Sequence, residues 1–129
     1  MDYQHDRHSV HLIVYHLIFC PKRRRRLLVG PVQTRLEHVI DEVITENGWQ
    51  LIERAIQPDH VHRFVRANPS TLPSDIPRLI KGRSSRLLRK ALVYLRTLSA
   101  LWSPSYFLST AGNVSSETIQ RSIERQSHE

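Results

Sequence analysis

The segment Val10–Cys20 constrains the fold more than any other part of the chain. It is rich in Val, Ile, Leu, Tyr and Phe, and it is apolar at both alternating positions. That pattern is typical of a central strand that is covered on both of its faces. His11 and His16 interrupt the segment, which is also shorter than the about 20 apolar residues of a membrane span. We therefore expect a sheet built around this strand, with material on both sides.

Turn signals and apolar spacing divide the rest of the chain into further helices and strands. Gly30-Pro31 begins a helix whose apolar residues recur at helical spacing until Asn47-Gly48. Pro58-Asp59 predicts the tight turn of a hairpin, and Ser74 is a suitable N-cap for a second long helix. The expected elements after the first strand are a helix from Gly30 to Asn47, strands Leu51–Gln57 and His60–Ala67, a helix Asp75–Ala91, a strand Tyr106–Ala111, a cap region Asn113–Ser116 and a helix Glu117–Gln126.

This order of elements, β-α-β-β-α-β with a C-terminal helix, predicts a single α+β domain over residues 1–129. In such a split βαββαβ arrangement, of the ferredoxin or RRM type, an antiparallel sheet carries two helices on one face. The other face is left to a partner subunit, a ligand or the last helix. Gly82, Ser84 and Ser85 lower the helix propensity in the middle of the second long helix, which indicates close approach by another backbone or a ligand.

The composition favours a polyanionic partner. The chain has 19 Lys and Arg against 12 Asp and Glu, for a net charge of +7. Nucleic acid is the commonest partner of so basic a protein; the alternative is a charge that only maintains solubility. Cys20 is the single cysteine, which excludes an internal disulfide and a cysteine-based zinc cluster. The polar N-terminus lacks the apolar run of a signal peptide, so we expect a cytoplasmic protein with no membrane segment.

Positive charge is concentrated in two places. Residues 22–26 are five consecutive cations, and the stretch from Ile76 to Ser116 contains seven cations and no acidic residue. A helix surface of one sign is typical of a phosphate-facing surface, although a solvated loop or helix face is the plainer alternative. The candidate DNA-binding residues are Lys22, Arg23, Arg24, Arg25, Arg26, Lys81, Arg83 and Arg86.

Two histidines and the last helix are the candidates for chemistry. His60 and His62 are separated by one residue of a strand, so both imidazoles point to the same face and lie close enough to share a divalent metal. The alternative is two polar residues on a solvated face. In the last helix, Ile119, Ser122, Ile123 and Gln126 share one face, which is equally typical of an ordinary amphipathic terminal helix.

Five collinear segments carry a resemblance to a known family. They are Tyr15-His-Leu-Ile-Phe-Cys-Pro-Lys22, Pro58-Asp-His-Val-His62, Leu79-Ile-Lys-Gly-Arg-Ser-Ser-Arg86, Leu101-Trp-Ser-Pro-Ser-Tyr-Phe107, and Glu117-Thr-Ile119 through Ile123-Glu-Arg-Gln126. Together they resemble the single-tyrosine transposases of the insertion-sequence 200/605 type, in the histidine-hydrophobic-histidine superfamily. The resemblance implies an antiparallel sheet with helices on one face, a homodimer, and action on single-stranded DNA, in particular the hairpin ends of a mobile element.

The resemblance also implies roles for individual residues. The family's metal ligands correspond to His60, His62 and Gln126, and the metal is Mg²⁺ or Mn²⁺, which polarises the scissile phosphate. A tyrosine then attacks, leaving a 5′-phosphotyrosine and a free 3′-OH, and a later 3′-OH attack rejoins the strands. His60 and His62 are accordingly expected at the catalytic centre, with position 122 supplying the nucleophile.

The chain departs from the family at that nucleophile. Ser122 stands where the tyrosine belongs, four residues before Gln126. A serine oxygen lies several ångströms closer to the helix axis, so in-line attack on a phosphate positioned for tyrosine is unfavourable. Gln57, Arg63 and Arg23 replace residue types usual in the family, and Arg63 is expected on the inward face, where an unpaired charge is costly.

Three hypotheses follow. The chain is a DNA strand transferase of this family, competent or not; a non-catalytic module that binds single-stranded DNA hairpins; or a nuclease that uses metal-bound water at His60, His62 and Gln126. RNA binding by the same sandwich is a weaker alternative, because the aromatic sheet-face motif of RNA-binding domains is not evident.

Overall fold

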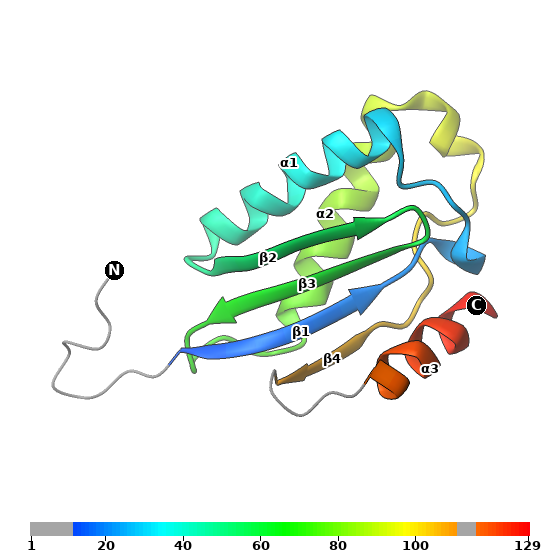
Figure 1. Cartoon of the computed structure of the whole chain (residues 1–129). Coiled ribbons are helices and arrows are strands. Elements are labelled where there is room, and N and C mark those ends of the chain that lie inside the picture. Colours follow the sequence, from blue (N-terminus) through cyan, green and yellow to red (C-terminus); the bar gives the residue numbers. More distant parts are fainter. Residues whose placement is uncertain (1–11, 111–115) are drawn as a thin grey trace, which may run out of the picture.

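The structure is a computed structural model, and it describes residues 12–110 and 116–129 (Figure 1). The start of the expected first strand, the final residue Ala111 of the expected strand Tyr106–Ala111, and most of the cap region Asn113–Ser116 lie outside these residues. The described elements are β1 (Ile13–Phe19), η2 (Lys22–Arg24), α1 (Gly30–Glu46), β2 (Gln50–Gln57), β3 (His60–Ala67), α2 (Asp75–Ala91), η3 (Val93–Thr97), β4 (Phe107–Thr110) and α3 (Ser116–Ser127).

The four strands form one antiparallel sheet in the order β2-β3-β1-β4. β1 is therefore a central strand, as its apolar sequence predicts. It pairs with β3 on one side, where Ile18 lies opposite His62, and with β4 on the other, where Ile18 lies opposite Phe107. This order and the two long helices confirm the split βαββαβ arrangement of an α+β fold.

The main core lies between the sheet and helices α1 and α2, which cover the same face (Figure 1). Alternation along β1 turns Leu17 and Phe19 into this core, and both are fully buried. The helix α1 begins as its sequence predicts, with Pro31 in the first turn. It ends at Glu46 with Asn47 as its C-cap, and Gly48 follows with a φ of 70°, in the left-handed region that glycine adopts without strain.

The opposite face of the sheet is covered in part by α3. Ile18 and Cys20, which alternate with the core residues of β1, are fully buried and pack against Ile123 of α3, with Phe107 beside them. A partner subunit, a ligand or the last helix was expected on this face, and the last helix covers the end of the sheet where β1 ends. It brings Ser122 and Gln126 to that end.

Several local expectations need correction. Nothing lies within 4 Å of where a Cβ would stand on Gly82, so that glycine does not admit a close approach from the described residues. Ser84 is where another segment approaches the helix closely: the residue is fully buried, and its hydroxyl accepts a hydrogen bond from Trp102 Nε1 at 3.0 Å. Ser74 occupies the N-cap position of α2 without a side-chain capping bond. The short turns η2 and η3 were not expected. None of the helices within the described ranges has the length and apolar character needed to cross a bilayer.

Candidate functional site

The strand β3 sorts its side chains onto two faces in the predicted way. Val61, Arg63 and Val65 are fully buried on the side covered by α1 and α2, whereas His60 and His62 are partly buried on the opposite side. The histidine pair therefore shares the sheet face that α3 partly covers. Arg63 is on the inward face, where its position in the sequence predicts it.

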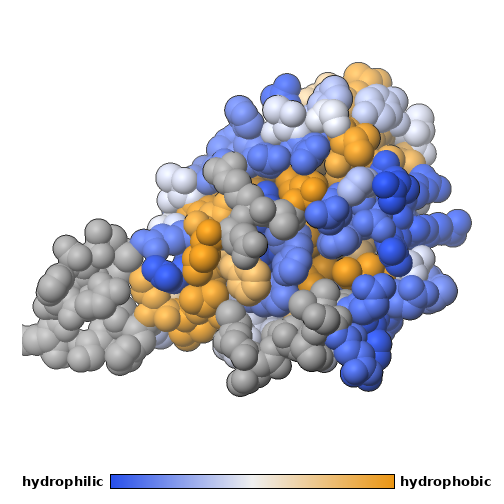
Figure 2. Space-filling view, in the orientation of Figure 1, coloured by the Kyte–Doolittle hydropathy of each residue, from blue (hydrophilic) through white to orange (hydrophobic). Residues whose placement is uncertain are grey.

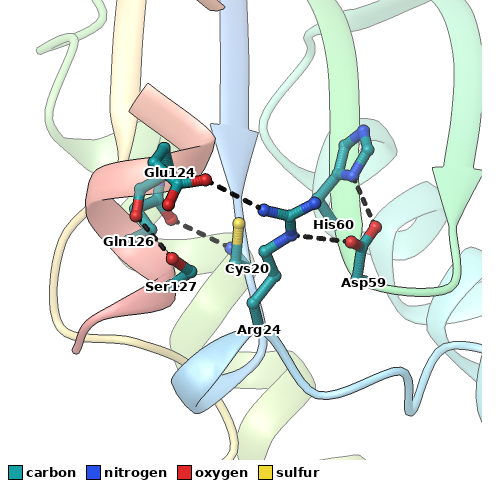
Figure 3. A network of polar contacts seen from close by, with 7 residues as sticks. All are labelled: Cys20, Arg24, Asp59, His60, Glu124, Gln126 and Ser127. Carbon is teal, nitrogen blue, oxygen red and sulfur yellow. Dashed lines mark hydrogen bonds and ion pairs between the residues drawn. The ribbon is translucent and has the colours of Figure 1, made fainter. Parts of the chain in front are cut away.

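His60 is held by the turn that precedes β3. Its Nδ1 lies 2.8 Å from Asp59 Oδ1, and the other oxygen of that carboxylate accepts a hydrogen bond from Arg24 Nε at 2.7 Å (Figure 3). Burial alone would raise the pKa of Asp59, but the hydrogen bonds from Arg24 and His60 outweigh burial and lower it. The carboxylate is therefore ionised at neutral pH and acts only as an acceptor.

His62 lies against His16 of β1. The two rings stack with centroids 4.2 Å apart and their Nε2 atoms in contact, and the Phe64 ring, next to His62 on β3, stacks on His16 at 4.5 Å. Burial, followed by the neighbouring His62, lowers the pKa of His16 to about 4, so His16 is neutral at physiological pH. The sequence alone does not place His16 in the site, because its proximity to His62 depends on the register of β1 against β3.

Gln126 is fully buried and faces the end of β1. Its Oε1 accepts hydrogen bonds from the Cys20 amide at 3.0 Å and from Ser103 Oγ at 3.2 Å. Its Nε2 donates to the Ile18 carbonyl at 3.4 Å and to Ser122 Oγ at 3.3 Å. All four bonding directions of the amide are thus used to attach α3 to the sheet and to the segment around Ser103.

The donor set for a divalent metal fits the site only in part. Two imidazoles on one sheet face are suitable types of ligand, and the Asp59 contact would leave His60 Nε2 to face a metal. The Nε2 atom of His62, in contrast, is in contact with Nε2 of His16 and would have to leave it before binding a metal. Gln126 would have to give up bonds to Cys20 and Ser103 before its oxygen could act as a third ligand. Within the described ranges, no cluster of three or more His, Cys, Asp or Glu side chains is arranged to hold a metal ion.

Ser122 is 5% exposed, and its hydroxyl accepts the hydrogen bond from Gln126. Beside it lies a cavity of about 470 Å³, whose lining includes Phe107 and two arginines of α3, Arg121 and Arg125. These two arginines were not among the predicted site residues, although their positions one residue before and three residues after Ser122 could have indicated them. A cavity with two guanidinium groups and an aromatic ring is suited to a phosphodiester.

The predicted DNA-binding residues have different surroundings. Arg23, Arg25, Arg26 and Arg86 are exposed, and hydrophilic surface gathers at the end of the molecule where η2 and α3 lie (Figure 2). Lys22 is partly buried, and Arg24 is engaged with Asp59.

The two remaining cations are bonded within the protein. Lys81 Nζ donates to the carbonyls of Ser103 at 2.7 Å and Ser105 at 3.0 Å. Arg83 lies 2.6 Å from Glu46 of α1. The stretch without acidic residues therefore finds a carboxylate on the neighbouring helix, which its own sequence does not reveal.

The comparison with known families decides the wider class of the protein. The family model described as "Transposase IS200 like" matches residues 9–126. The chain belongs to the IS200-like transposase family. The ISDra2 transposase TnpA of Deinococcus radiodurans is 33% identical to it over 129 residues, a match that covers 98% of this chain and 92% of that protein.

Two solved structures are similar to this IS200-like transposase. A crystal structure of a putative transposase from Deinococcus radiodurans R1 has a TM-score of 0.85 and 32% identity, covering 93% of this chain and 95% of that one. A REP-associated tyrosine transposase bound to a REP hairpin has a TM-score of 0.59 and 18% identity, covering 87% of this chain and 62% of that one. At 18% identity, the similarity to this second structure shows a shared fold alone.

Proposed function

We propose that this IS200-like transposase binds single-stranded DNA hairpins, such as the ends of a mobile element, and that Ser122 leaves it unable to cut DNA through a phosphotyrosine. Exposed arginines of η2, Arg23 and the neighbouring Arg25 and Arg26, would contact phosphates. The hairpin bound by the REP-associated relative of the same fold supports this choice of DNA. A homodimer and a cytoplasmic location remain predictions from the family resemblance and the composition.

The single observation that carries the proposal is the burial of Ser122. A nucleophile must reach an in-line position about 3–3.5 Å from the phosphorus. The Ser122 hydroxyl instead lies between α3 and the sheet, bonded to Gln126 Nε2. Ser122 borders the adjoining cavity, but a serine oxygen lies several ångströms closer to the helix axis than a tyrosine oxygen would, so it does not reach a phosphate positioned for tyrosine.

Mg²⁺ or Mn²⁺ is proposed as the cofactor of this site, with His60 and His62 as its protein ligands and Gln126 as the third when released from β1. Bound there, the ion would supply Lewis-acid polarisation of a phosphate oxygen. The chain's own contribution is the orientation of the two imidazoles: Asp59 fixes His60, and His16 stacks on His62.

The test is incubation of the protein with labelled single-stranded DNA hairpins and Mn²⁺, followed by denaturing and native gels. The proposal predicts a retarded complex, no covalent adduct and no cleavage, with Ser122→Ala behaving identically. A covalent adduct that Ser122→Ala abolishes would establish a competent strand transferase. Cleavage without an adduct, lost in His60→Ala, would establish a metal-dependent nuclease instead.

A further inference from the structure

The turn between β2 and β3 contains a carboxylate that serves two partners at once. Asp59 Oδ1 lies 2.8 Å from His60 Nδ1, and Asp59 Oδ2 lies 2.7 Å from Arg24 Nε (Figure 3). The Asp59 side chain is only 14% exposed and that of His60 is 19% exposed, so their contact is largely shielded from bulk water, and the Arg24 side chain is partly buried at 31% exposed. Bonds of this kind, between charged or polar groups away from solvent, fix side-chain orientation.

This contact selects the tautomer of His60. An ionised carboxylate has no proton to donate, so the hydrogen atom in the contact belongs to His60 Nδ1. The Nε2 atom then carries the lone pair. Metal-binding histidines in proteins generally donate their other ring N–H to a carboxylate or carbonyl in this way.

Arg24 is brought to Asp59 by an unusual backbone. Arg23 and Arg24 have φ values of 59° and 55°, in the left-handed region that residues with a Cβ rarely adopt. Backbone hydrogen bonds surround the turn: the Arg24 amide donates to the Pro21 carbonyl at 2.7 Å, and the Leu28 amide donates to the Pro58 carbonyl at 3.0 Å. The first bond closes the turn itself and the second ties the segment after β1 to the hairpin turn, so the disfavoured conformation persists because its surroundings determine it.

The same guanidinium also lies near the last helix. Arg24 Nη1 is 3.6 Å from Glu124 Oε2, two residues from both Ser122 and Gln126 (Figure 3). The Glu124 side chain is 60% exposed, so this ion pair is weaker than the one with Asp59. Arg24 thus stands between the histidine-bearing hairpin and the helix that carries Ser122.

We propose that Asp59 and Arg24 are positioning residues of the metal site: Asp59 holds His60 with Nε2 ready for the metal, and Arg24 holds Asp59. The proposal rests on the proposed role of His60 as a metal ligand. It removes Arg24 from the group of phosphate-binding cations, because its guanidinium is already engaged on two sides. The left-handed backbone at Arg23 and Arg24 then serves to bring the Arg24 guanidinium to Asp59.

The experiment has two readouts on the full chain at one fixed pH. Long-range ¹H–¹⁵N NMR of the metal-free protein reports the tautomer of His60, and calorimetric titration with Mn²⁺ reports metal affinity. The variants are Asp59→Ala, Asp59→Asn and Arg24→Ala. The matched control is Arg35→Ala, which removes an exposed arginine of α1 on the far side of the sheet. Thermal unfolding of each variant verifies that it is folded.

We expect the Nδ1–H tautomer in the wild type and in Arg35→Ala. Asp59→Ala should shift His60 to the Nε2–H tautomer and weaken Mn²⁺ binding about 10- to 100-fold, the usual effect of removing a partner of a ligating histidine. Arg24→Ala should weaken it less, because the carboxylate remains. If Asp59→Ala does not fold, Asp59→Asn provides the test, since its amide keeps the shape and loses the charge, and the same direction of change is expected.

Two results would overturn the proposal: His60 keeping the wild-type tautomer in a folded Asp59 variant, or Mn²⁺ binding tightly to the wild type and equally tightly to that variant. If the wild type binds no Mn²⁺, the metal site in the proposed function is wrong. The role of Asp59 as a positioning residue of a metal site then fails with it, and the NMR result alone shows whether Asp59 still sets the tautomer of His60.

Discussion

Replacing Gln126 with leucine should destabilise the metal-free protein, because the amide is part of the folded structure as well as a candidate metal ligand. Cys20 lies one residue beyond β1, and its N–H is bonded to Gln126 Oε1 at 3.0 Å in a fully buried position. Leucine has a similar volume and cannot replace that acceptor. A buried backbone group without a partner costs about 1–3 kcal/mol.

The other three contacts of the amide add to this cost by smaller amounts. The bonds to the Ile18 carbonyl and Ser122 Oγ are long, at 3.4 and 3.3 Å, and the hydroxyls can rotate. The destabilisation has an upper limit, because α3 could detach from the sheet and let water hydrate these groups. Detachment would expose the buried Ile123, which costs about 1.5–3 kcal/mol. We therefore expect a loss of about 2–3 kcal/mol in the free energy of unfolding.

The assay is urea unfolding followed by the fluorescence of the buried Trp49 and Trp102, with amide hydrogen exchange to locate the change in α3. Gln120→Leu is the matched control, since Gln120 is exposed on the same helix and its replacement should be nearly neutral. Equal stabilities of the Gln126 and Gln120 variants, with unchanged exchange in α3, would refute the reasoning.

Four further predictions concern other groups. Burial, followed by the charge of Asp59, raises the pKa of Cys20 to about 12, so the thiol should resist a disulfide reagent at pH 8 until the protein is unfolded; rapid reaction of the native protein would contradict this. The pKa of Asp59 is lowered in the folded protein, so its ionised carboxylate stabilises the fold above the unfolded pKa of about 3.9, and this stability is lost as the pH falls below that value. Asp59→Ala should therefore cost more stability at pH 7 than at pH 3 in thermal unfolding. An equal cost at both pH values would be evidence against the ion pair. In a salt titration of hairpin binding, Arg25→Ala and Arg86→Ala should each lower the slope by about one unit, whereas Lys81→Ala, whose ammonium is bonded to two carbonyls, should lower it less; unchanged slopes would remove these arginines from the DNA surface. A cavity of about 470 Å³ lies beside Ser122 and has room for a larger side chain. The Ser122→Tyr variant should form a covalent DNA adduct in Mn²⁺, and the Ser122→Phe variant should not. Equal behaviour of the two variants would show that the missing phenol is not what prevents cleavage.

The sequence predicts the architecture well because the relevant signals are local. Alternation along β3 places His60 and His62 opposite the core residues Val61 and Val65, and the structure agrees. Helix periodicity and turn residues give the bounds of α2 without error and those of α1 and β2 to within one residue. These features depend on neighbouring residues in the chain, which is the information that a single sequence contains.

The contacts of the site could not be predicted, because they join distant segments. The stacking of His16 on His62 depends on strand register, and the bond of Arg24 to Asp59 depends on two left-handed residues that arginine does not favour. The attachment of Gln126 to Cys20 spans almost the whole chain. A helical pattern indicates which residues face inward and does not indicate which groups they meet.

Hairpin recognition without cleavage is the central claim, and equilibrium binding of the wild type tests it most directly. Fluorescence anisotropy would compare a labelled DNA hairpin with an unpaired strand of the same base composition, in Mn²⁺ and at several salt concentrations, with the DNA recovered intact afterwards. We predict tighter binding of the hairpin, an affinity that falls steadily as salt rises, and uncut DNA. Equal affinity for both strands, or a hairpin recovered cut and attached to the protein, would contradict the account.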